Sequence, residues 1–280
     1  MQSEQSLRVG YIPYLNCAPF FHYLADTGFS GSIVPGVPSA LNTMLQSGAI
    51  DVSPSSSFEY ALHSQDYLLL PDHSISSLGP VQSVLLFSPC PLNELQGQRI
   101  AITGESATSI NLLRVLLLEY FKFPQVDDYV PVESVESLIA DKQPALLIGD
   151  RAMKQAANLS EEMICYDLGA LWFEQTGLPF VFALWILRRD RAQQMAAQLS
   201  ELLQQLELSV QRAFSDLAAL AQNIGFTGEE VASLVNYWQT MDYTLTDEHL
   251  AGLDLFVKLC CKHELLINLP KITFFKPIYS

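Results

Sequence analysis

Short apolar runs of strand length alternate with segments of helical periodicity near the start of the chain. Residues 7–12, 32–37 and 50–53 form the apolar runs, and residues 18–25, 39–46 and 58–63 form the helical segments that follow them. A strand followed by a helix, repeated in this way, is typical of βαβ units around a largely parallel sheet. The sequence therefore predicts an α/β fold.

Two prolines interrupt the alternation. The run 81–87 ends in Ser88-Pro89-Cys90-Pro91, where proline breaks a strand because it lacks a backbone donor. The pattern restarts with a strand at 99–103, a long amphipathic helix at 107–121 and a buried strand at 145–148. This restart indicates a second α/β unit.

A second boundary is predicted where the chain returns. Residues 179–187 are so apolar that we expect a central strand there, and the following residues are mainly helical, at 190–219, 228–240 and 247–262. We therefore expect a discontinuous first lobe of residues 1–88 plus 186–280, with the C-terminal helices, and a second lobe of residues 89–185.

Charge and hydropathy exclude two classes of partner. The chain has 280 residues, 30 of them acidic and 15 basic, and the formal charge of −15 repels a phosphate backbone, so we expect no nucleic-acid binding. Its apolar runs are shorter than the ~20 residues that cross a bilayer, so we expect no membrane span. The first residues lack the features of a secretion signal, which predicts a cytoplasmic protein. Oligomeric state is not indicated.

Neither the cysteines nor the histidines predict a metal site. The 5 cysteines and 5 histidines show no metal-ligand spacing, and two of the cysteines are adjacent. Reduced thiols and structural histidines are the simpler interpretation, so we expect no metal and no disulfide.

Polar motifs follow several predicted strands. The motif at 103–109 (TGESATS) lies between a strand and a long helix, where amides and hydroxyls at a helix N-terminus form an anion site. Its candidate ligand-binding residues are Thr103, Gly104, Ser106, Thr108 and Ser109. The alternative is that Ser106 only caps the helix. Ser55, Ser56 and Ser57 occupy the equivalent turn of the first lobe, with the same two interpretations.

Four further residues are candidates from their positions. Asn16 follows the first strand, where open α/β sheets bind ligands, although an Asx turn is an equal alternative. Ser83 lies among apolar neighbours and must bond either backbone or ligand. Asp150 and Arg151 follow the strand at 145–148, where Arg151 forms either a carboxylate clamp or a salt bridge.

Several of these segments together resemble one known family. The order and spacing of the motifs resemble the chorismate dehydratases of the menaquinone (futalosine) pathway, whereas the chain after about residue 190 is generic. The segments that carry the resemblance are 8–16 with 18–20, 36–38 with 41–42, 48–52, 55–60, 75–84, 103–109, 147–152 and 167–183.

The resemblance implies a fold and an activity. The fold would be that of a two-lobed type II periplasmic binding protein with a ligand cleft between the lobes. The activity would be a cofactor-free hydro-lyase that removes water from chorismate to give 3-((1-carboxyvinyl)oxy)benzoate. The resemblance implies that Asn16 and Ser83 are catalytic residues at the reacting centre and that the serines and threonines of the motifs bind the carboxylates of the substrate.

A sister family that makes 1,4-dihydroxy-6-naphthoate shares the early motifs and carries a catalytic histidine after the strand equivalent to 145–148. Gly149 occupies that position here, which favours the dehydratase. The base is then the enolpyruvyl carboxylate of chorismate itself, with Glu59 and Glu105 as protein alternatives. A non-catalytic solute-binding or sensor protein for a small carboxylate is the rival interpretation.

Overall fold

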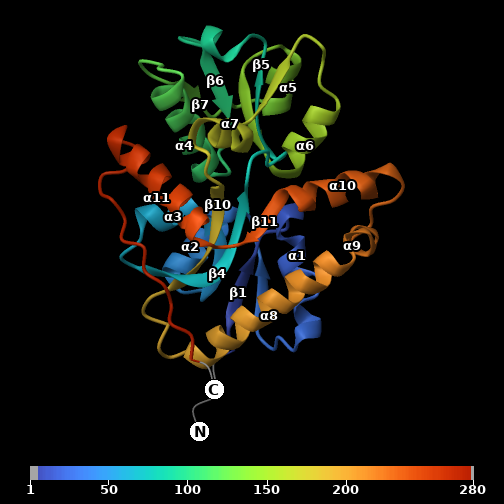
Figure 1. Cartoon of the computed structure of the whole chain (residues 1–280), viewed down its shortest axis with the longest axis vertical. Helices are drawn as coiled ribbons and strands as arrows, with labels where there is room; N and C mark the ends of the chain where they lie inside the picture. Colours follow the sequence, from blue (N-terminus) through green and yellow to red (C-terminus); the bar gives the residue numbers. More distant parts are fainter. Residues whose placement is uncertain (1–5, 279–280) are drawn as a thin grey trace.

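The computed structural model describes residues 6–278 and contains two β-sheets, each covered by helices (Figure 1). The first sheet has six strands in the order β11-β4-β10-β3-β1-β2, and the second has five in the order β7-β6-β8-β5-β9. The two sheets form the lower and upper lobes of Figure 1. The predicted two-lobed α/β architecture is confirmed.

The first sheet is mixed. Its strands, in sheet order, are β11 (Met241–Thr244), β4 (Tyr67–Ser77), β10 (Phe180–Arg188), β3 (Val52–Ser56), β1 (Arg8–Tyr11) and β2 (Ser32–Pro35). Only β1, β2 and β3 run parallel, while β10 is antiparallel to β3 and β4, and β11 is antiparallel to β4. The predicted parallel order thus holds for the βαβ part and fails at β10, β4 and β11.

The second sheet is also mixed. Its strands are β7 (Asp127–Tyr129), β6 (Arg99–Ile102), β8 (Ala145–Ile148), β5 (Val84–Ser88) and β9 (Ile164–Asp167). Strand β6 is parallel to β7 and β8, whereas β5 is antiparallel to both β8 and β9.

Sheet membership corrects the predicted lobe boundaries. Strand β5 belongs to the second sheet, so the chain crosses between residues 77 and 84, before the prolines and not after residue 88. Strand β10 lies wholly in the first sheet, so the return precedes residue 180 and not residue 186. The prolines follow the last residue of β5 and mark the end of that strand, not a crossing between lobes. The prediction placed the crossing there because a strand end and a change of sheet give the same local signal in the sequence.

Strand β4 was not expected from the sequence. It spans 11 residues but contains Pro71 and Asp72, and Asp72 has a φ of 67° that few non-glycine residues adopt. The pairing of β4 with β10 shifts register across these residues, because Leu69 pairs with Ile186 and Ser74 pairs with Leu184. A bulge therefore lets one long strand contain a segment that resembles a turn.

Helices cover both sheets. The first lobe carries α1 (Ala18–Phe21), α2 (Pro38–Ser47) and α3 (Ser57–Leu62), and the second carries α4 (Ala107–Val115), α5 (Val135–Ala140), α6 (Gly149–Ala157) and α7 (Leu168–Thr176). The predicted helix at 107–121 continues past α4 as a π-turn over residues 116–120. Short 3₁₀ turns occupy Leu15–Cys17, Leu24–Thr27 and Leu92–Glu94.

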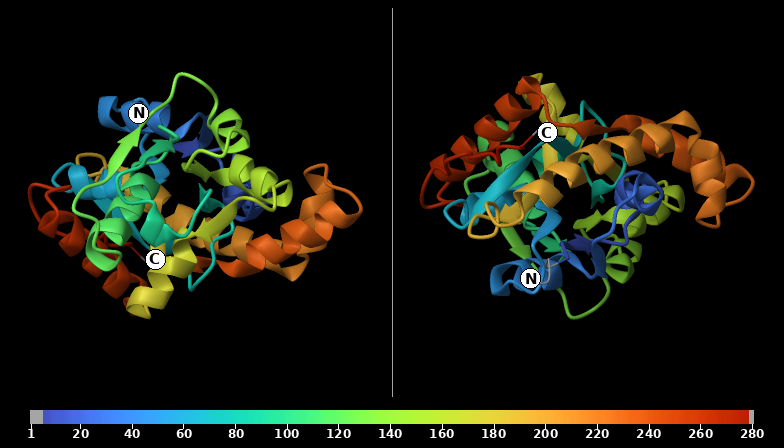
Figure 2. Two further views of the ribbon diagram at one scale, coloured as in Figure 1. Left: turned by 90° about the horizontal axis from the view of Figure 1, so that it is seen from above. Right: turned by 90° about the horizontal axis from the view of Figure 1, so that it is seen from below.

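The C-terminal helices belong to the first lobe. They are α8 (Ala196–Ser215), α9 (Leu217–Asn223), α10 (Glu229–Thr240) and α11 (Asp247–Lys262). Helices α8, α9 and α10 form an arm that extends sideways and returns toward the junction of the lobes, as the two views of Figure 2 show. Strand β11 follows α10 directly, so this arm ends in the first sheet.

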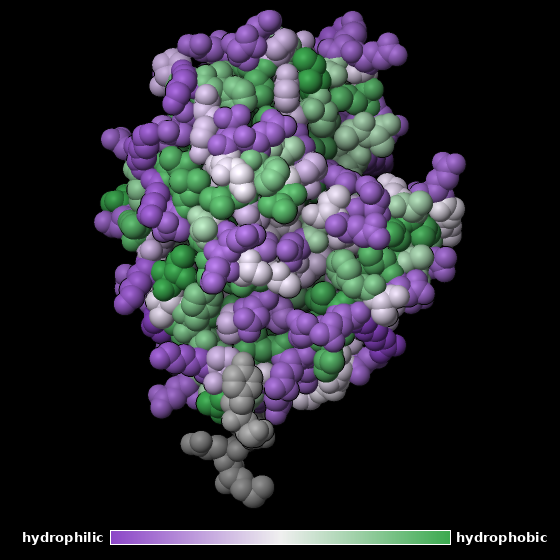
Figure 3. All heavy atoms as spheres, viewed as in Figure 1, coloured by the Kyte–Doolittle hydropathy of each residue, from purple (hydrophilic) through white to green (hydrophobic). Residues whose placement is uncertain are grey.

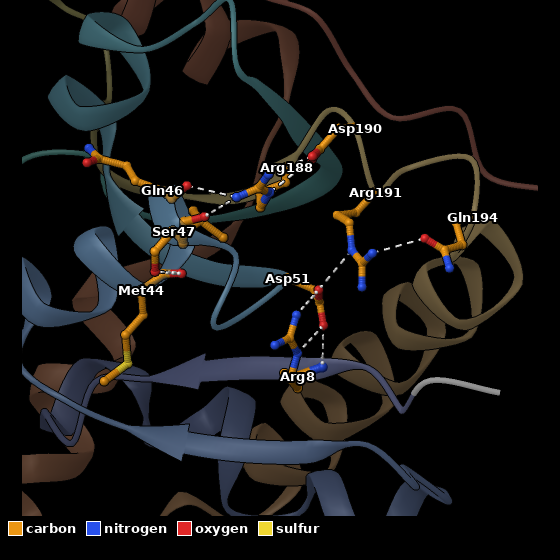
Figure 4. Close-up of polar contacts among 10 residues, drawn as sticks. Arg8, Met44, Gln46, Ser47, Asp51, Arg188, Asp190, Arg191 and Gln194 are labelled. Atoms are coloured by element: carbon orange, nitrogen blue, oxygen red, sulfur yellow. Dashed lines mark hydrogen bonds and ion pairs between the residues drawn. The ribbon is translucent and has the colours of Figure 1, made fainter. Parts of the chain in front are cut away.

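An ion-pair network holds the end of the first sheet farthest from the second lobe (Figure 4). The Asp51 side chain is 2% exposed, and its carboxylate accepts hydrogen bonds from the Arg8 amide at 3.0 Å, from Arg8 Nε at 2.9 Å and from Arg191 Nε at 3.4 Å. Nearby, Arg188 Nη1 donates to the Gln46 carbonyl oxygen at 2.8 Å, at the end of α2. Arg8 and Arg191 thus provide hydrogen-bond donors to the buried Asp51 carboxylate.

The face shown in Figure 3 carries hydrophilic and hydrophobic areas side by side. Among residues 6–278, no helix combines the length and apolar character that a membrane span requires.

Candidate functional site

A cavity of about 80 Å³ lies between the lobes and is lined by residues of both. The lining residues are Ile12, Tyr14, Asn16, Pro38, Ser56, Val81, Ser83, Val84, Glu105, Ser106, Ser109, Ile148, Gly149, Phe182, Ala183 and Met241. Most of them come from the carboxyl ends of β1, β3 and β8, from the first crossing and from the N-terminus of α4, and the others come from β10 and from the first residues of α2 and β11. The carboxyl ends of strands are where open α/β sheets bind ligands.

Asn16 lies in the 3₁₀ turn after β1, and its Oδ1 atom is buried with no hydrogen-bond partner in the described part of the chain. The Asn16 main chain is held because the Tyr243 hydroxyl donates to its carbonyl oxygen at 2.9 Å. A buried acceptor without a partner costs free energy, so it marks a place where a ligand donor fits.

Ser83 lies at the end of the first crossing and is 3% exposed. Its hydroxyl donates to the Val81 carbonyl oxygen at 3.3 Å and accepts from the Tyr237 hydroxyl at 3.0 Å. The sequence left backbone bonding and ligand binding open for Ser83, and the structure shows a long backbone bond together with a place on the cavity wall.

Three serines at helix starts also line the cavity. Ser106 caps α4, where its Oγ accepts from the Ser109 amide at 3.3 Å and lies 3.1 Å from Ser109 Oγ. Ser56 caps α3 by accepting from the Glu59 amide at 3.2 Å. Capping and exposure to the cavity are therefore compatible at these positions.

Five predicted substrate-binding residues do not line the cavity; they are Ser55, Ser57, Thr103, Gly104 and Thr108. The Ser55 side chain points to the other face of β3, because successive strand residues alternate, and donates to Asn42 Oδ1 at 3.1 Å. The side chains of Ser57 and Thr108 are 3.2 Å apart, and Thr108 Oγ1 accepts from the Phe58 amide at 2.9 Å. Ser57 and Thr108 therefore bond one lobe to the other instead of facing the cavity.

Asp150 and Arg151 also lie outside the cavity wall. Arg151 forms a salt bridge, as one interpretation predicted, but with Glu136 at 2.7 Å and Glu105 at 3.0 Å instead of with Asp150. The Arg151 guanidinium lowers the pKa of Glu136. Asp150 Oδ1 accepts from the Leu15 amide of the other lobe at 3.4 Å, and burial raises the Asp150 pKa.

The two protein alternatives for the base differ in position. Glu105 lines the cavity, where its carboxylate is bonded to Arg151 and accepts from the Tyr14 hydroxyl at 3.3 Å. Burial, together with the Glu105 charge, raises the pKa of Tyr14 to about 12. Glu59 does not line the cavity, and its carboxylate accepts from Gln46 Nε2 at 3.1 Å.

Several functional candidates escaped the sequence analysis. Tyr14 lies inside segment 8–16, which carries part of the family resemblance, so its neighbours could have indicated it. Tyr237, Met241 and Tyr243 come from α10 and β11, a region that has no motif, and only the fold brings them to Asn16 and Ser83.

No cluster of three or more metal-ligating side chains occurs within residues 6–278. The arrangement provides neutral donors and acceptors, one carboxylate (Glu105) that is paired with Arg151, and two helix starts around a buried space. Such a site suits a small oxygen-rich acid.

Comparison with known proteins places the chain in a family. Residues 7–262 match the family described as menaquinone biosynthesis. The chain is 41% identical to a chorismate dehydratase from Thermus thermophilus over 65% of this chain and 70% of that protein. It is 27% identical to a 1,4-dihydroxy-6-naphthoate synthase from the same organism, over 70% and 71% of the two chains.

A solved structure supports the fold. The chain resembles the periplasmic aliphatic sulphonate binding protein SsuA from Escherichia coli with a TM-score of 0.65 and 16% identity, over 99% of this chain and 95% of that one. This likeness shows a fold shared with periplasmic binding proteins, as the resemblance had implied. Since the family match covers nearly all of the described residues, the chain belongs to the menaquinone biosynthesis family.

Proposed function

We propose that the protein is a chorismate dehydratase, a carbon–oxygen hydro-lyase that converts chorismate into 3-((1-carboxyvinyl)oxy)benzoate and water. The observation that carries this proposal is the partnerless Asn16 Oδ1 in a cavity that also presents Ser83, Ser56, Ser106 and Ser109. The relative of 41% identity carries the same activity in its name.

The chemistry needs orientation more than strong catalytic groups. Chorismate loses the proton on its ether carbon and the neighbouring ring hydroxyl, and the product ring becomes aromatic. The ring carboxylate is conjugated with the adjacent double bond and can accept charge as the proton leaves. The protein then has to hold the two carboxylates and the leaving hydroxyl in one geometry and exclude water.

Each cavity group has a task in this scheme. Asn16 Oδ1 accepts a hydrogen bond from the ring hydroxyl, and Ser83 donates to an oxygen of the reacting centre. Ser106 and Ser109, at the positive end of α4, hold one carboxylate, and Ser56 holds the other. Asp150 and Arg151 act indirectly, because Arg151 fixes Glu105 and Asp150 bonds to the turn that carries Asn16.

We propose that the base is the enolpyruvyl carboxylate of chorismate. This carboxylate is tethered a few bonds from the proton, so binding need not bring in a separate base. Glu105 is the protein alternative on the cavity wall, but its carboxylate is already bonded to Arg151 and Tyr14. The scheme requires neither a metal nor another cofactor.

One assay tests the proposal against its rival. Purified protein is incubated with chorismate and the products are followed by mass spectrometry, with heat-denatured protein as the control. We expect a product lighter than chorismate by one water. Chorismate that is bound but unchanged would instead identify a solute-binding protein, which the likeness to SsuA makes the specific rival.

The same assay tests the base. Glu105→Gln keeps the size of the side chain and removes its basicity. We expect single-turnover rates within about 10-fold of wild type, whereas loss of a general base typically costs ~10²–10⁴-fold. A loss in that larger range from a well-folded variant would identify Glu105 as the base.

A further inference from the structure

The main chain of Ser83 is fixed from both sides. Its carbonyl oxygen accepts from the Gly149 amide at 2.7 Å, at the start of α6. The two residues before it donate to the Asp167 carboxylate, Val81 at 3.0 Å and Gln82 at 2.6 Å. Gln82 has a φ of 60°, so this tight crossing is held in an uncommon backbone conformation. With the main chain held, the side chain of Ser83 can still rotate and change the direction of its hydroxyl proton.

Tyr237 removes much of that freedom. Its side chain is 1% exposed, and its hydroxyl lies 3.0 Å from Ser83 Oγ. Ser83 Oγ is the acceptor that the described residues offer to the Tyr237 proton, so this proton occupies one lone pair of Ser83. The Ser83 proton must then point elsewhere, either to Val81 or into the cavity.

The bond to Val81 is weak enough to be exchanged. At 3.3 Å it is longer than the ~2.7–2.8 Å that is usual for a hydroxyl donor and an oxygen acceptor. A substrate oxygen in the cavity could therefore replace the Val81 carbonyl as the acceptor. Tyr237 remains a donor throughout, because burial raises its pKa well above the ordinary value for tyrosine.

The segment around Tyr237 reaches the candidate site at several points. Trp238 Nε1 donates to the Leu15 carbonyl oxygen at 2.8 Å, and the Tyr243 hydroxyl donates to the Asn16 carbonyl oxygen at 2.9 Å. Met241, which lies between Trp238 and Tyr243 in the sequence, lines the cavity. The end of α10 and strand β11 thus contact the main chain of Leu15 and Asn16 and the side chain of Ser83.

We propose that Tyr237 is a positioning residue, which donates to Ser83 and thereby directs the Ser83 hydroxyl as a donor toward an oxygen of bound chorismate. The inference rests on the proposed function, since the oxygen is assigned to that substrate. Tyr237 itself does not line the cavity and acts only through Ser83.

A double-mutant cycle tests the proposal. The proteins are wild type, Tyr237→Phe, Ser83→Ala and the double variant, each measured for kcat and KM with chorismate and, by calorimetry, for chorismate affinity. We expect Tyr237→Phe to lower kcat about 10-fold, the order of one lost hydrogen bond. In the Ser83→Ala background the same change should have no further effect on kcat or affinity.

Tyr60→Phe is the matched control. Tyr60 is also 1% exposed, and its hydroxyl bonds the Lys271 carbonyl oxygen at 3.0 Å and the Thr273 amide at 2.8 Å, away from the cavity. This variant should lose thermal stability and keep its kcat. It therefore separates loss of a buried tyrosine hydroxyl from loss of Ser83 orientation.

Two results would overturn the inference. One is an unchanged kcat in Tyr237→Phe, and the other is an effect of equal size in the presence and absence of the Ser83 hydroxyl. A wild-type protein that binds chorismate without dehydrating it would contradict the proposed function alone, because the affinity cycle would still show whether Tyr237 acts through Ser83. If the wild-type protein neither binds nor dehydrates chorismate, the proposed function and the role of Tyr237 are both contradicted.

Discussion

At the scale of single residues, the partnerless oxygen of Asn16 makes a sharp prediction. Asn16→Ala should lower turnover on the order of 100-fold, as expected when a preorganised polar group at the reacting centre is lost. Its melting temperature should stay unchanged or rise, since the variant removes a buried acceptor that has no partner among the described residues. Turnover and thermal unfolding are measured on the same preparation.

Asn42→Ala is the control for this prediction. Asn42 is also an asparagine of the first lobe, but it bonds Ser55 and does not line the cavity. It should keep near-wild-type turnover. Near-wild-type turnover in Asn16→Ala would show that the partnerless oxygen has no part in the reaction.

The sequence predicts the placement of a side chain where the chain itself fixes its direction, and the binding role of that side chain stays a prediction. Ser56 and Ser106 follow strands and cap helices, so their position at the cavity is determined locally. Thr108 is the second residue of α4, and its hydroxyl oxygen accepts a hydrogen bond from the Phe58 amide of the other lobe instead. That outcome depends on how the lobes pack, which no local pattern contains.

At the scale of elements, the buried carboxylate of Asp51 bonds β1 to the loop after β10. Asp51→Ala should lower the free energy of unfolding by about 3–5 kcal/mol, because it leaves two arginines without the buried partner that they share. The measurement is chemical denaturation with a single fluorescence probe.

Asp190→Ala provides the comparison. Asp190 also pairs with an arginine, Arg188, but its side chain is 60% exposed. Exposed pairs are worth about 0–1 kcal/mol, so this variant should remain close to wild type. Equal losses in the two variants would show that the Asp51 network contributes no more than a surface ion pair.

Elements were predicted unevenly, and the reason is physical. Strands β1 and β8 are short apolar runs next to helices, and the sequence predicts them. The apolar run at 50–53 predicts only the start of β3, which continues through polar residues to Ser56. Strand β4 was missed because Pro71 and Asp72 form a bulge within it. Helix α10 was predicted, but nothing in its periodicity indicates that Tyr237 contacts Ser83 across the fold.

At the scale of the whole molecule, the cavity is too small for its proposed ligand. Its volume of about 80 Å³ lies well below the ~300–1,000 Å³ that is common for small-molecule pockets. The lobes are held together by contacts such as that between Tyr14 and Glu105 at 3.3 Å and that between Phe58 and Thr108 at 2.9 Å. The structure therefore corresponds to a closed arrangement that must open to admit substrate.

Solution scattering checks this expectation. The radius of gyration should be larger for the empty protein, whose lobes open to admit substrate, than for the protein saturated with product, because a ligand that contacts both lobes draws them toward each other. The control is the same titration with a small sugar that the site does not bind. An identical radius with and without product would argue against opening and closing of the lobes.

The antiparallel insertion of β10 between β3 and β4 has a consequence for synthesis on the ribosome. Every strand of the second sheet has been translated by residue 167, whereas the first sheet lacks an inner strand until residues 180–188 follow and an edge strand until residues 241–244 follow. Domains generally fold as units during translation. The N-terminal strands must therefore wait with an unpaired edge while the lobe encoded after them folds, so newly made chains should need protection from aggregation at that edge.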